Sequence, residues 1–415
     1  MPEGSARARG VRALYLSYDG MCDPLGASQV MPYLLGLAER GHRISLISFE
    51  KPERTAEERT AVTRSCEAAG IVWYPLAYHR WPPVLSTLYD VAAMRRLAAR
   101  LHRRERFDLV HCRSYVPALV GLGMKRRAGV RFLFDMRGFW ADERIEGGAW
   151  NPANPLYRLI YRFFKKSELA FWEQADEVVS LTEEARRTIV ATDPCAAPIA
   201  VIPCCVDFEL FSSATTATRE TARQLLGIAA DARVLAYLGS IGLSNMLDEM
   251  LDFFKSFRER HNGAKFLFIT QSPEAEIIRA AAAKGIPESN IIVRAAHRPE
   301  VPKFMAAVDT GITFKRPSYS AKACSPTKLG EMLALEIPVV VNCGVGDVDR
   351  LVAEAGAGVI VESFDYESYR DAVTRLDELK PNMAVWRRIT RREFDLQIGI
   401  ERYAAIYRNL LHSSS

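Results

Sequence analysis

The segment with the clearest chemical potential is CSPTKLGEMLALEIPVVVN at 324–342, which we expect to form a helix followed by a strand. Ser325 suits the N-cap position and Pro326 suits the first helical position. The helix start would then present free N–H groups and the positive end of its dipole, which together attract a phosphate. Lys328, one turn into the helix, adds a full positive charge.

The same helix carries a carboxylate close to this start. Glu331 lies one turn after Thr327, so the two can share a helix face. A carboxylate at that place can accept hydrogen bonds from sugar hydroxyls, and the whole segment would then hold a sugar phosphate. The alternative is a well-capped helix with a Lys328–Glu331 pair on its surface.

Glycine-containing loops follow two expected strands. In YLGSIGLSNMLDEML (237–251), Gly239 and Gly242 would let the backbone approach a phosphate closely, although a simple tight turn explains them equally well. The loop YDGMCDPLGASQ, with Asp19 and Gly26, also leads into a helix. It lacks the GxGxxG pattern, which argues against a standard dinucleotide site.

Charged and aromatic residues crowd the loop FDMRGFWADERIEGG at 134–148, directly after an expected strand. Asp135, Arg137 and Trp140 in this loop are candidates for binding a sugar or an anion. The alternative is a surface loop whose charges pair with one another. His111 and Arg113 follow another strand, and a lone histidine is more often a packed residue than a catalytic one.

Several classes of protein do not fit this sequence. The seven histidines form no metal-binding pattern, the GxSxG of hydrolases is missing, and no nucleic-acid-binding module is present. The eight cysteines contain no CxxC, so we expect reduced thiols in a cytoplasm. The first residues lack the apolar core of a secretory signal, and we find no apolar run of about 20 residues that would cross a membrane.

The elements that must position the candidate residues alternate along the chain. Apolar strand patterns and helical patterns follow one another to the end, which predicts parallel sheets with helices on both faces. The strand patterns lie at 12–17, 43–48, 71–76, 108–112, 131–136, 177–182, 234–239, 265–270, 290–295, 310–314, 338–342 and 358–362. Helices are expected at 27–40, 86–105, 115–128 and 155–175, and 396–411 reads as one amphipathic helix.

The length of 415 residues predicts two domains, and the strand–helix rhythm restarts after IAVIPCCVDFELF (199–211). We therefore predict two doubly wound Rossmann-like domains with a cleft between them and a boundary near 205–212. Ligands should bind in the loops after the strands.

Charge is unevenly distributed between the two halves. Residues 1–205 contain 29 Lys and Arg and 23 Asp and Glu, so they hold the whole positive excess of the chain, whose net charge is +5. Residues 156–166, within the expected helix at 155–175, mix Tyr, Phe, Arg and Lys and could lie at an anionic membrane surface. An ordinary solvated helix face is the alternative.

Taken together, the chain resembles glycosyltransferase family 4 with the GT-B fold, over nearly its whole length. The opening YLSYDGMCDPLGASQVMPYLLGLAERGHRISLIS resembles the first βαβ unit of that family, VIPCCVDFELF its interdomain segment, and SPTKLGEMLALEIPVVVN its donor-site helix. The DMRGFWADER loop and the GSIG turn are similar to those of bacterial surface-polysaccharide enzymes.

The resemblance implies an acceptor-binding domain at 1–205, a donor-binding domain at 206–395 and a C-terminal helix at 396–415 that packs back on the first domain. It implies retaining sugar transfer from a nucleotide diphosphate sugar to a glycan or lipid-linked acceptor, with no cofactor or metal. Partners would include an anionic membrane but no nucleic acid, and the protein would be cytoplasmic, on the inner face of the cytoplasmic membrane. The alternatives are a sugar-nucleotide 2-epimerase of the same fold and a non-catalytic sugar-nucleotide-binding subunit.

Glu331 matches the family's second glutamate, which binds the nucleotide ribose. Ala323 stands where the first glutamate is usual, and Ser240 and Asn245 stand where the family has a diphosphate-binding Arg and Lys. Lys328, the helix amides, and Lys315 or Arg316 can supply the missing charge. The expected site residues are Asp135, Arg137 and Lys328 for catalysis; Gly239, Ser240, Gly242, Lys315, Ser325, Thr327, Lys328 and Glu331 for the donor; and Asp19, Gly26, Arg113 and Trp140 for the acceptor.

Overall fold

The computed structural model describes residues 10–211, 218–242 and 244–412. The chain divides into two compact units, one formed by residues 1–202 together with 396–415 and the other by 203–395. Each unit is described separately below. The expectation of no secretory signal rests partly on residues 1–9, which lie outside the described ranges.

The first unit is built on a seven-stranded parallel sheet with the order β3-β2-β1-β4-β5-β6-β7. Its central strands are buried on both faces, which explains their almost uninterrupted apolar sequences. The strands are β1 (Arg12–Ser17), β2 (Arg43–Glu50), β3 (Val72–Ala77), β4 (Leu109–Arg113), β5 (Arg131–Asp135), β6 (Glu177–Ser180) and β7 (Ile199–Val201).

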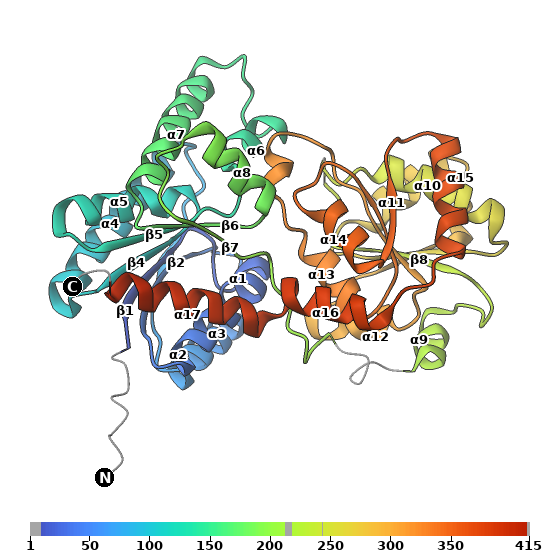
Figure 1. Cartoon of the computed structure of the whole chain (residues 1–415), viewed down its shortest axis with the longest axis horizontal. Helices are drawn as coiled ribbons and strands as arrows, with labels where there is room; N and C mark the ends of the chain where they lie inside the picture. Colours follow the sequence, from blue (N-terminus) through green and yellow to red (C-terminus); the bar gives the residue numbers. More distant parts are fainter. Residues whose placement is uncertain (1–9, 212–217, 243, 413–415) are drawn as a thin grey trace, which may run out of the picture. The chain divides into compact units, whose positions relative to one another are not determined.

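Helices cover both faces of this sheet (Figure 1). They are α1 (Pro24–Gln29), α2 (Met31–Glu39), α3 (Ala56–Ala68), α4 (Leu85–Glu105), α5 (Tyr115–Ala128), α6 (Trp140–Glu146), α7 (Pro155–Gln174), α8 (Glu183–Thr192) and α17 (Leu396–His412). The single helix expected at 27–40 is wrong, because Val30 leaves the helical conformation and α2 starts anew with Pro32 in its first turn. Proline has no N–H to continue a helix from the preceding turn.

The C-terminal helix α17 belongs to the first unit, where it contacts α2 and β4. Gly36 on α2 allows this close packing, because a Cβ atom there would lie 2.4 Å from Cδ1 of Ile400. Arg402 of α17 also donates to the carbonyl of Val201 at 3.2 Å. The last helix therefore completes the core of the first unit.

The second unit has a six-stranded parallel sheet with the order β10-β9-β8-β11-β12-β13. Its strands are β8 (Val234–Leu238), β9 (Lys265–Ile269), β10 (Ile291–Arg294), β11 (Thr310–Thr313), β12 (Val339–Asn342) and β13 (Gly358–Val361). Its α-helices are α9 (Arg219–Leu226), α10 (Leu247–Arg260), α11 (Glu274–Ala283), α12 (Val301–Met305), α13 (Thr327–Ala334), α14 (Val348–Ala355), α15 (Tyr366–Asp377) and α16 (Met383–Phe394). The 3₁₀ turns are η2 (Glu288–Asn290), η3 (Arg298–Glu300) and η4 (Ser320–Ala323).

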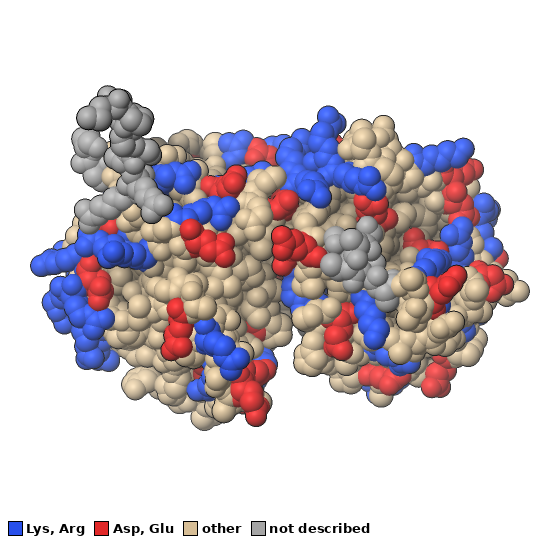
Figure 2. Space-filling view, turned by 90° about the horizontal axis from the view of Figure 1, so that it is seen from below, with Lys and Arg blue, Asp and Glu red and all other residues tan. Residues whose placement is uncertain are grey.

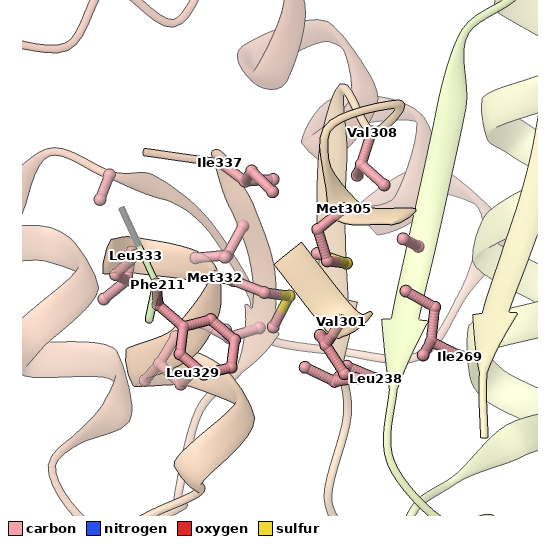
Figure 3. Packing of buried hydrophobic residues seen from close by; sticks show 14 of the residues in the cluster. Phe211, Leu238, Ile269, Val301, Met305, Val308, Leu329, Met332, Leu333 and Ile337 are labelled. Atoms are coloured by element: carbon pink, nitrogen blue, oxygen red, sulfur yellow. The ribbon is translucent and has the colours of Figure 1, made fainter. Parts of the chain in front are cut away.

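The helix that carries Lys328 and Glu331 is anchored in the core of this unit. Figure 3 shows Leu329, Met332 and Leu333 of α13 packed among apolar side chains from neighbouring elements, including Phe211 and Met305. All three α13 side chains are buried. The apolar face of α13 thus fixes the direction in which its polar residues point.

Both sheets are doubly wound, which means that the order in which successive strands are added reverses direction between two central strands. The reversal falls between β1 and β4 in the first unit and between β8 and β11 in the second. Ligands of such sheets bind outside the carboxyl ends of the strands at this switch point. The loops after β1, β8 and β11 contain Asp19, Gly239, Ser240, Gly242 and Lys315, and Arg113 ends β4. Asp135 ends the neighbouring strand β5, and Lys328 and Glu331 lie on α13.

Two surface features bear on partners. On the face shown in Figure 2, each unit carries both acidic and basic side chains, separated by uncharged areas. Within the described ranges, no helix combines the length and apolar character that crossing a membrane requires.

Candidate functional site

The first cluster of polar residues lies at the switch point of the first unit. Asp19 follows β1, and Arg113 ends the neighbouring strand β4. The guanidinium Nε of Arg113 donates to the Asp19 carboxylate at 3.2 Å. Only 3% of the Arg113 side chain is exposed, and its Nη1 atom has no hydrogen-bond partner among the described residues. A buried cation with an unused donor is suited to a polar ligand.

Asp135 lies beside this pair, at the end of β5. Arg137 Nη1 is 3.7 Å from Asp135 Oδ1, and His111 Nε2 is 3.5 Å from Asp135 Oδ2. Arg137 has the left-handed φ of 59° and Ser114 a φ of 66°, values that are costly for residues other than glycine. Such strain is concentrated at functional sites, and here it falls on the turns after two adjacent strands.

The charges in this cluster are set by burial and by neighbouring cations. Burial by itself would raise the pKa of Asp135, but Arg137, His111 and Arg113 act more strongly in the opposite direction and lower it. Asp135 is therefore a carboxylate at neutral pH. Burial lowers the pKa of His111, which is consequently a neutral imidazole.

His111 connects this cluster to the C-terminal helix. Its Nδ1 atom is 3.0 Å from the hydroxyl of Tyr407, and its ring packs against Tyr15 and Tyr403. The histidine is thus a packed core residue as well as a neighbour of Asp135. If the tyrosine hydroxyl donates to Nδ1, the remaining ring proton lies on Nε2 and points to the carboxylate.

We expect Tyr407→Phe to lower the free energy of unfolding by about 1–2 kcal/mol, because it leaves a buried histidine nitrogen without its partner. Urea denaturation measures this change. Tyr366→Phe is the matched control, since it removes a hydroxyl that bonds to Glu259 on the exposed surface. If both variants lost the same free energy of unfolding, the bond between Tyr407 and His111 would contribute no more stability than a bond on the exposed surface.

Two of the residues expected to bind the acceptor are placed differently. The ring of Trp140 packs with Tyr115, Trp150 and Phe164 in an aromatic cluster, with the Arg144 guanidinium above it. Gly26 is buried in α1, where a Cβ atom would lie 2.0 Å from the carbonyl oxygen of Gly20. Close packing therefore accounts for this glycine, and the Trp140 ring is part of the aromatic cluster.

The second cluster lies at the switch point of the second unit and is centred on Lys328. Its ammonium donates to the hydroxyl of Tyr237 at 2.6 Å and lies 4.1 Å from the centroid of that ring. Gly239, directly after β8, has a φ of +113°, and a Cβ atom there would lie 3.2 Å from Lys328 Nζ. Only glycine fits beside the lysine in this conformation.

Helix α13 begins one residue later than expected. Pro326, not Ser325, is its N-cap, and no side chain caps the helix start. Ser325 Oγ instead accepts a hydrogen bond from the N–H of Cys204 at 3.1 Å. The proposed capping role of Ser325 is therefore wrong, whereas the start at Thr327 leaves backbone N–H groups uncapped beside Lys328.

Glu331 is buried, and its partner is not Lys328. Arg298, in the 3₁₀ turn after β10, donates to Glu331 Oε1 at 2.5 Å. Burial raises the pKa of Glu331, and Arg298 opposes this effect. Arg298 was not among the residues expected from the sequence, although it lies shortly after the strand pattern at 290–295, where ligand-binding residues are expected.

The remaining donor-site candidates surround Lys328 less closely. Lys315 follows β11, and its ammonium is 3.3 Å from the Ser244 hydroxyl. The carbonyl of Ser240 accepts from Tyr237 at 2.8 Å and from Asn245 at 3.1 Å, so Asn245 braces this turn. Gly242 is exposed and free of steric crowding, and its nearest contact for a Cβ atom is Asn245 at 3.8 Å.

The position expected for a first glutamate lies in the interior. Ala323 ends the 3₁₀ turn η4 and is 1% exposed. Among the described residues, no group of three or more His, Cys, Asp and Glu side chains is arranged to hold a metal ion.

The two doubly wound parallel-sheet units have the architecture of the GT-B fold, which the solved structures below share. The N-terminal half matches the model described as Glycosyltransferase Family 4 over residues 30–210, and the C-terminal half matches Glycosyl transferases group 1 over 218–393. The chain therefore belongs to the family 4 glycosyltransferases and is a glycosyltransferase.

Solved structures with low sequence identity share this fold. Sucrose-phosphate synthase from Thermosynechococcus elongatus has a TM-score of 0.72 at 14% identity, with 98% of this chain and 100% of that chain covered. HepE from Anabaena, in complex with UDP and glucose, has a TM-score of 0.67 at 15% identity, covering 95% and 99%. WaaG, a glycosyltransferase involved in lipopolysaccharide biosynthesis, has a TM-score of 0.67 at 17% identity, covering 95% and 99%. No curated protein sequence matches the chain.

Proposed function

We propose that the chain is a retaining, metal-independent hexosyltransferase that moves a sugar from a nucleotide diphosphate sugar to a glycan or lipid-linked acceptor. The observation that carries this proposal is the position of Lys328, which lies beside Gly239 and the uncapped start of α13 at the switch point of the second sheet. The complexes of HepE with UDP and UDP-glucose make UDP the first nucleotide to test.

The donor would be held by the second unit. Lys328 and the N–H groups at the start of α13 face the diphosphate, and Glu331, held by Arg298, accepts hydrogen bonds from the ribose hydroxyls. As the bond between the sugar's anomeric carbon and the diphosphate breaks, negative charge grows on the leaving phosphate. A nearby ammonium and fixed N–H groups stabilise that charge.

The acceptor would be held by the first unit, where Arg113, Asp135 and Arg137 form the buried polar cluster. An acceptor hydroxyl then forms the new bond to the anomeric carbon on the face that the diphosphate leaves. Its proton passes to the departing phosphate oxygen, so the configuration is retained without a separate protein base. Asp135 and Arg137 position the acceptor for this step.

We place this reaction in the synthesis of a cell-surface polysaccharide such as lipopolysaccharide, exopolysaccharide or capsule. The protein would act in the cytoplasm, in peripheral contact with the inner face of the cytoplasmic membrane. The resemblance of the DMRGFWADER loop and the GSIG turn to such enzymes supports this role, as does the positive excess of residues 1–205. An anionic lipid surface attracts a basic domain.

The test measures nucleotide release from UDP-, GDP- and ADP-sugars, with and without glycan and lipid-linked acceptors, and the anomeric configuration of the product by NMR. We expect acceptor-dependent release, an unchanged anomeric configuration and full activity after EDTA treatment. Conversion of the sugar nucleotide without an acceptor would identify an epimerase instead. Binding without turnover for every donor would identify a non-catalytic subunit.

Donor affinity should fall as the pH rises above neutrality. Burial lowers the pKa of Lys328 to about 7, and Lys315 adds like-charge repulsion. Below this pH the lysine already carries the charge that attracts the diphosphate. Above it, binding must first draw a proton, which costs up to about tenfold in affinity per pH unit.

Calorimetric titration of the nucleotide between about pH 6 and pH 9 measures this dependence. Lys328→Arg is the control, because a guanidinium stays charged throughout the range and should flatten the profile. A wild-type affinity that does not change above neutral pH would contradict the assignment. The depressed pKa also predicts that folding stability rises with pH between about 7 and 10.5, where the unfolded chain binds the extra proton.

A further inference from the structure

The N-terminal part of α7 carries an apolar strip that is exposed among the described residues. The buried side chains of this helix are Phe164, Glu168, Phe171 and Trp172, so none lies before position 164. Leu156, Leu159 and Phe163 are 49%, 66% and 51% exposed. In Figure 1 this part of α7 and the loop before it stand clear of the sheet.

A row of cations runs beside the apolar strip. Arg158, Arg162 and Lys166 are all exposed, and none of them forms an ion pair within the described part of the chain. Lys165 differs, because it turns inward to Asp142 and Glu168. From 147 to 167 the sequence contains four cations and no carboxylate.

The spacing places the two rows side by side on one helix surface. The apolar residues recur at i, i+3 and i+7, and the cations recur at i, i+4 and i+8, so each row follows the helix axis. An exposed apolar strip flanked by cations is the surface of a helix that lies in a membrane interface. Self-association is disfavoured, because a two-fold contact would bring the same cations of two copies together.

We infer that the N-terminal part of α7, residues 155–166, docks on an anionic lipid surface. The inference rests on the proposed function in one respect, namely that such docking would hold a lipid-linked acceptor near its site. The structure supplies the connection: α6 begins shortly after Arg137, and its Asp142 accepts hydrogen bonds from Tyr161 at 2.8 Å and Lys165 at 2.9 Å on α7. The docking helix is thereby tied to the loop that carries Asp135 and Arg137.

Another exposed apolar set has no row of cations running beside it, although Arg80 precedes it and Arg95 and Arg96 follow it. Trp81, Leu85 and Leu88 are 80%, 63% and 60% exposed, at and before the start of α4. No Lys or Arg lies between Trp81 and Met94. This set therefore offers a control for the loss of exposed apolar area alone.

The experiment is flotation of the full-length protein with vesicles of phosphatidylcholine, with and without about 30% phosphatidylglycerol, at low salt. We expect binding only to the anionic vesicles. The variant Arg158→Ser/Arg162→Ser/Lys166→Ser should bind about 100-fold more weakly, because each cation near an anionic surface contributes about fivefold. Leu156→Ser/Leu159→Ser/Phe163→Ser should also lose binding, since it removes the strip that enters the interface.

Two matched variants keep the test specific. Lys255→Ser/Arg279→Ser/Lys303→Ser removes three exposed charges from the second unit, and Leu85→Ser/Leu88→Ser removes apolar area from α4; both should float like the wild type. Equal losses in either control, or no binding of the wild type to anionic vesicles, would overturn the inference. The inference would also be overturned if Leu156→Ser/Leu159→Ser/Phe163→Ser changed the sedimenting mass but not flotation. The strip would then contact a second copy of the chain.

The vesicles contain neither donor nor acceptor, so the result does not depend on catalysis. A protein that floats as expected but never transfers sugar would contradict the proposed function and leave the docking surface intact. A protein that transfers sugar but does not float would contradict the docking surface and the proposed membrane contact, and would leave the proposed sugar transfer intact.

Discussion

Replacing Lys328 by alanine should lower kcat/KM for the donor by about 100- to 1,000-fold, which is the usual effect of losing one group that stabilises a developing oxyanion. The lysine is the only full charge that the structure places against both Tyr237 and Gly239, among the residues described. Its removal would leave the helix N–H groups alone to face the diphosphate. The change is measured from initial rates of nucleotide release at varied donor concentration.

Lys303→Ala provides the matched control, because it removes an exposed lysine of the same unit on α12. Its kinetics should equal those of the wild type. Thermal unfolding of both variants establishes that they are folded. A Lys328→Ala enzyme with wild-type turnover and donor affinity would remove this residue from the donor site.

Replacing Arg137 by alanine should act on the acceptor instead. We expect kcat/KM for the acceptor to fall by about 100-fold, because losing a positioning contact misplaces the attacking hydroxyl. The guanidinium of Arg137 lies 3.7 Å from Asp135 Oδ1 and lowers the pKa of that buried carboxylate. The variant removes this effect. The left-handed backbone of Arg137 indicates that the fold tolerates strain to hold this side chain in place.

The distinguishing measurement is the split between the two substrates. Donor affinity, measured by calorimetry with the nucleotide alone, should stay at the wild-type value in Arg137→Ala. Arg144→Ala is the control, since this arginine lies above the Trp140 ring in the aromatic cluster. Unchanged acceptor kinetics in Arg137→Ala would exclude its role in the acceptor site.

The strands of both sheets could be predicted because each one is encoded by a short, continuous run of residues. Strands buried on both faces need apolar runs of about five residues, and those runs stand out in sequence. The rule that ligands meet the carboxyl ends of strands then brought Asp135, Arg113 and Gly239 into consideration. Family resemblance added the ribose-binding role of Glu331 and the function.

Other features depend on partners that are distant in sequence. Ser325 was expected to cap a helix, but its hydroxyl bonds to the backbone of a residue 121 positions away. Arg298 reaches Glu331 across 33 positions, and Tyr407 reaches His111 across 296. Periodicity cannot reveal such pairs, because they form only when the sheet and the last helix are assembled.

The most direct test of the central claim is a thermal-shift comparison of the wild type and Lys328→Ala with UDP, GDP, ADP and CMP, without added metal. A ligand that binds the native state raises the melting temperature. We predict that one nucleoside diphosphate stabilises the wild type and that this stabilisation is lost in Lys328→Ala. A panel without any shift, or an equal shift in both proteins, would contradict a diphosphate site at the start of α13.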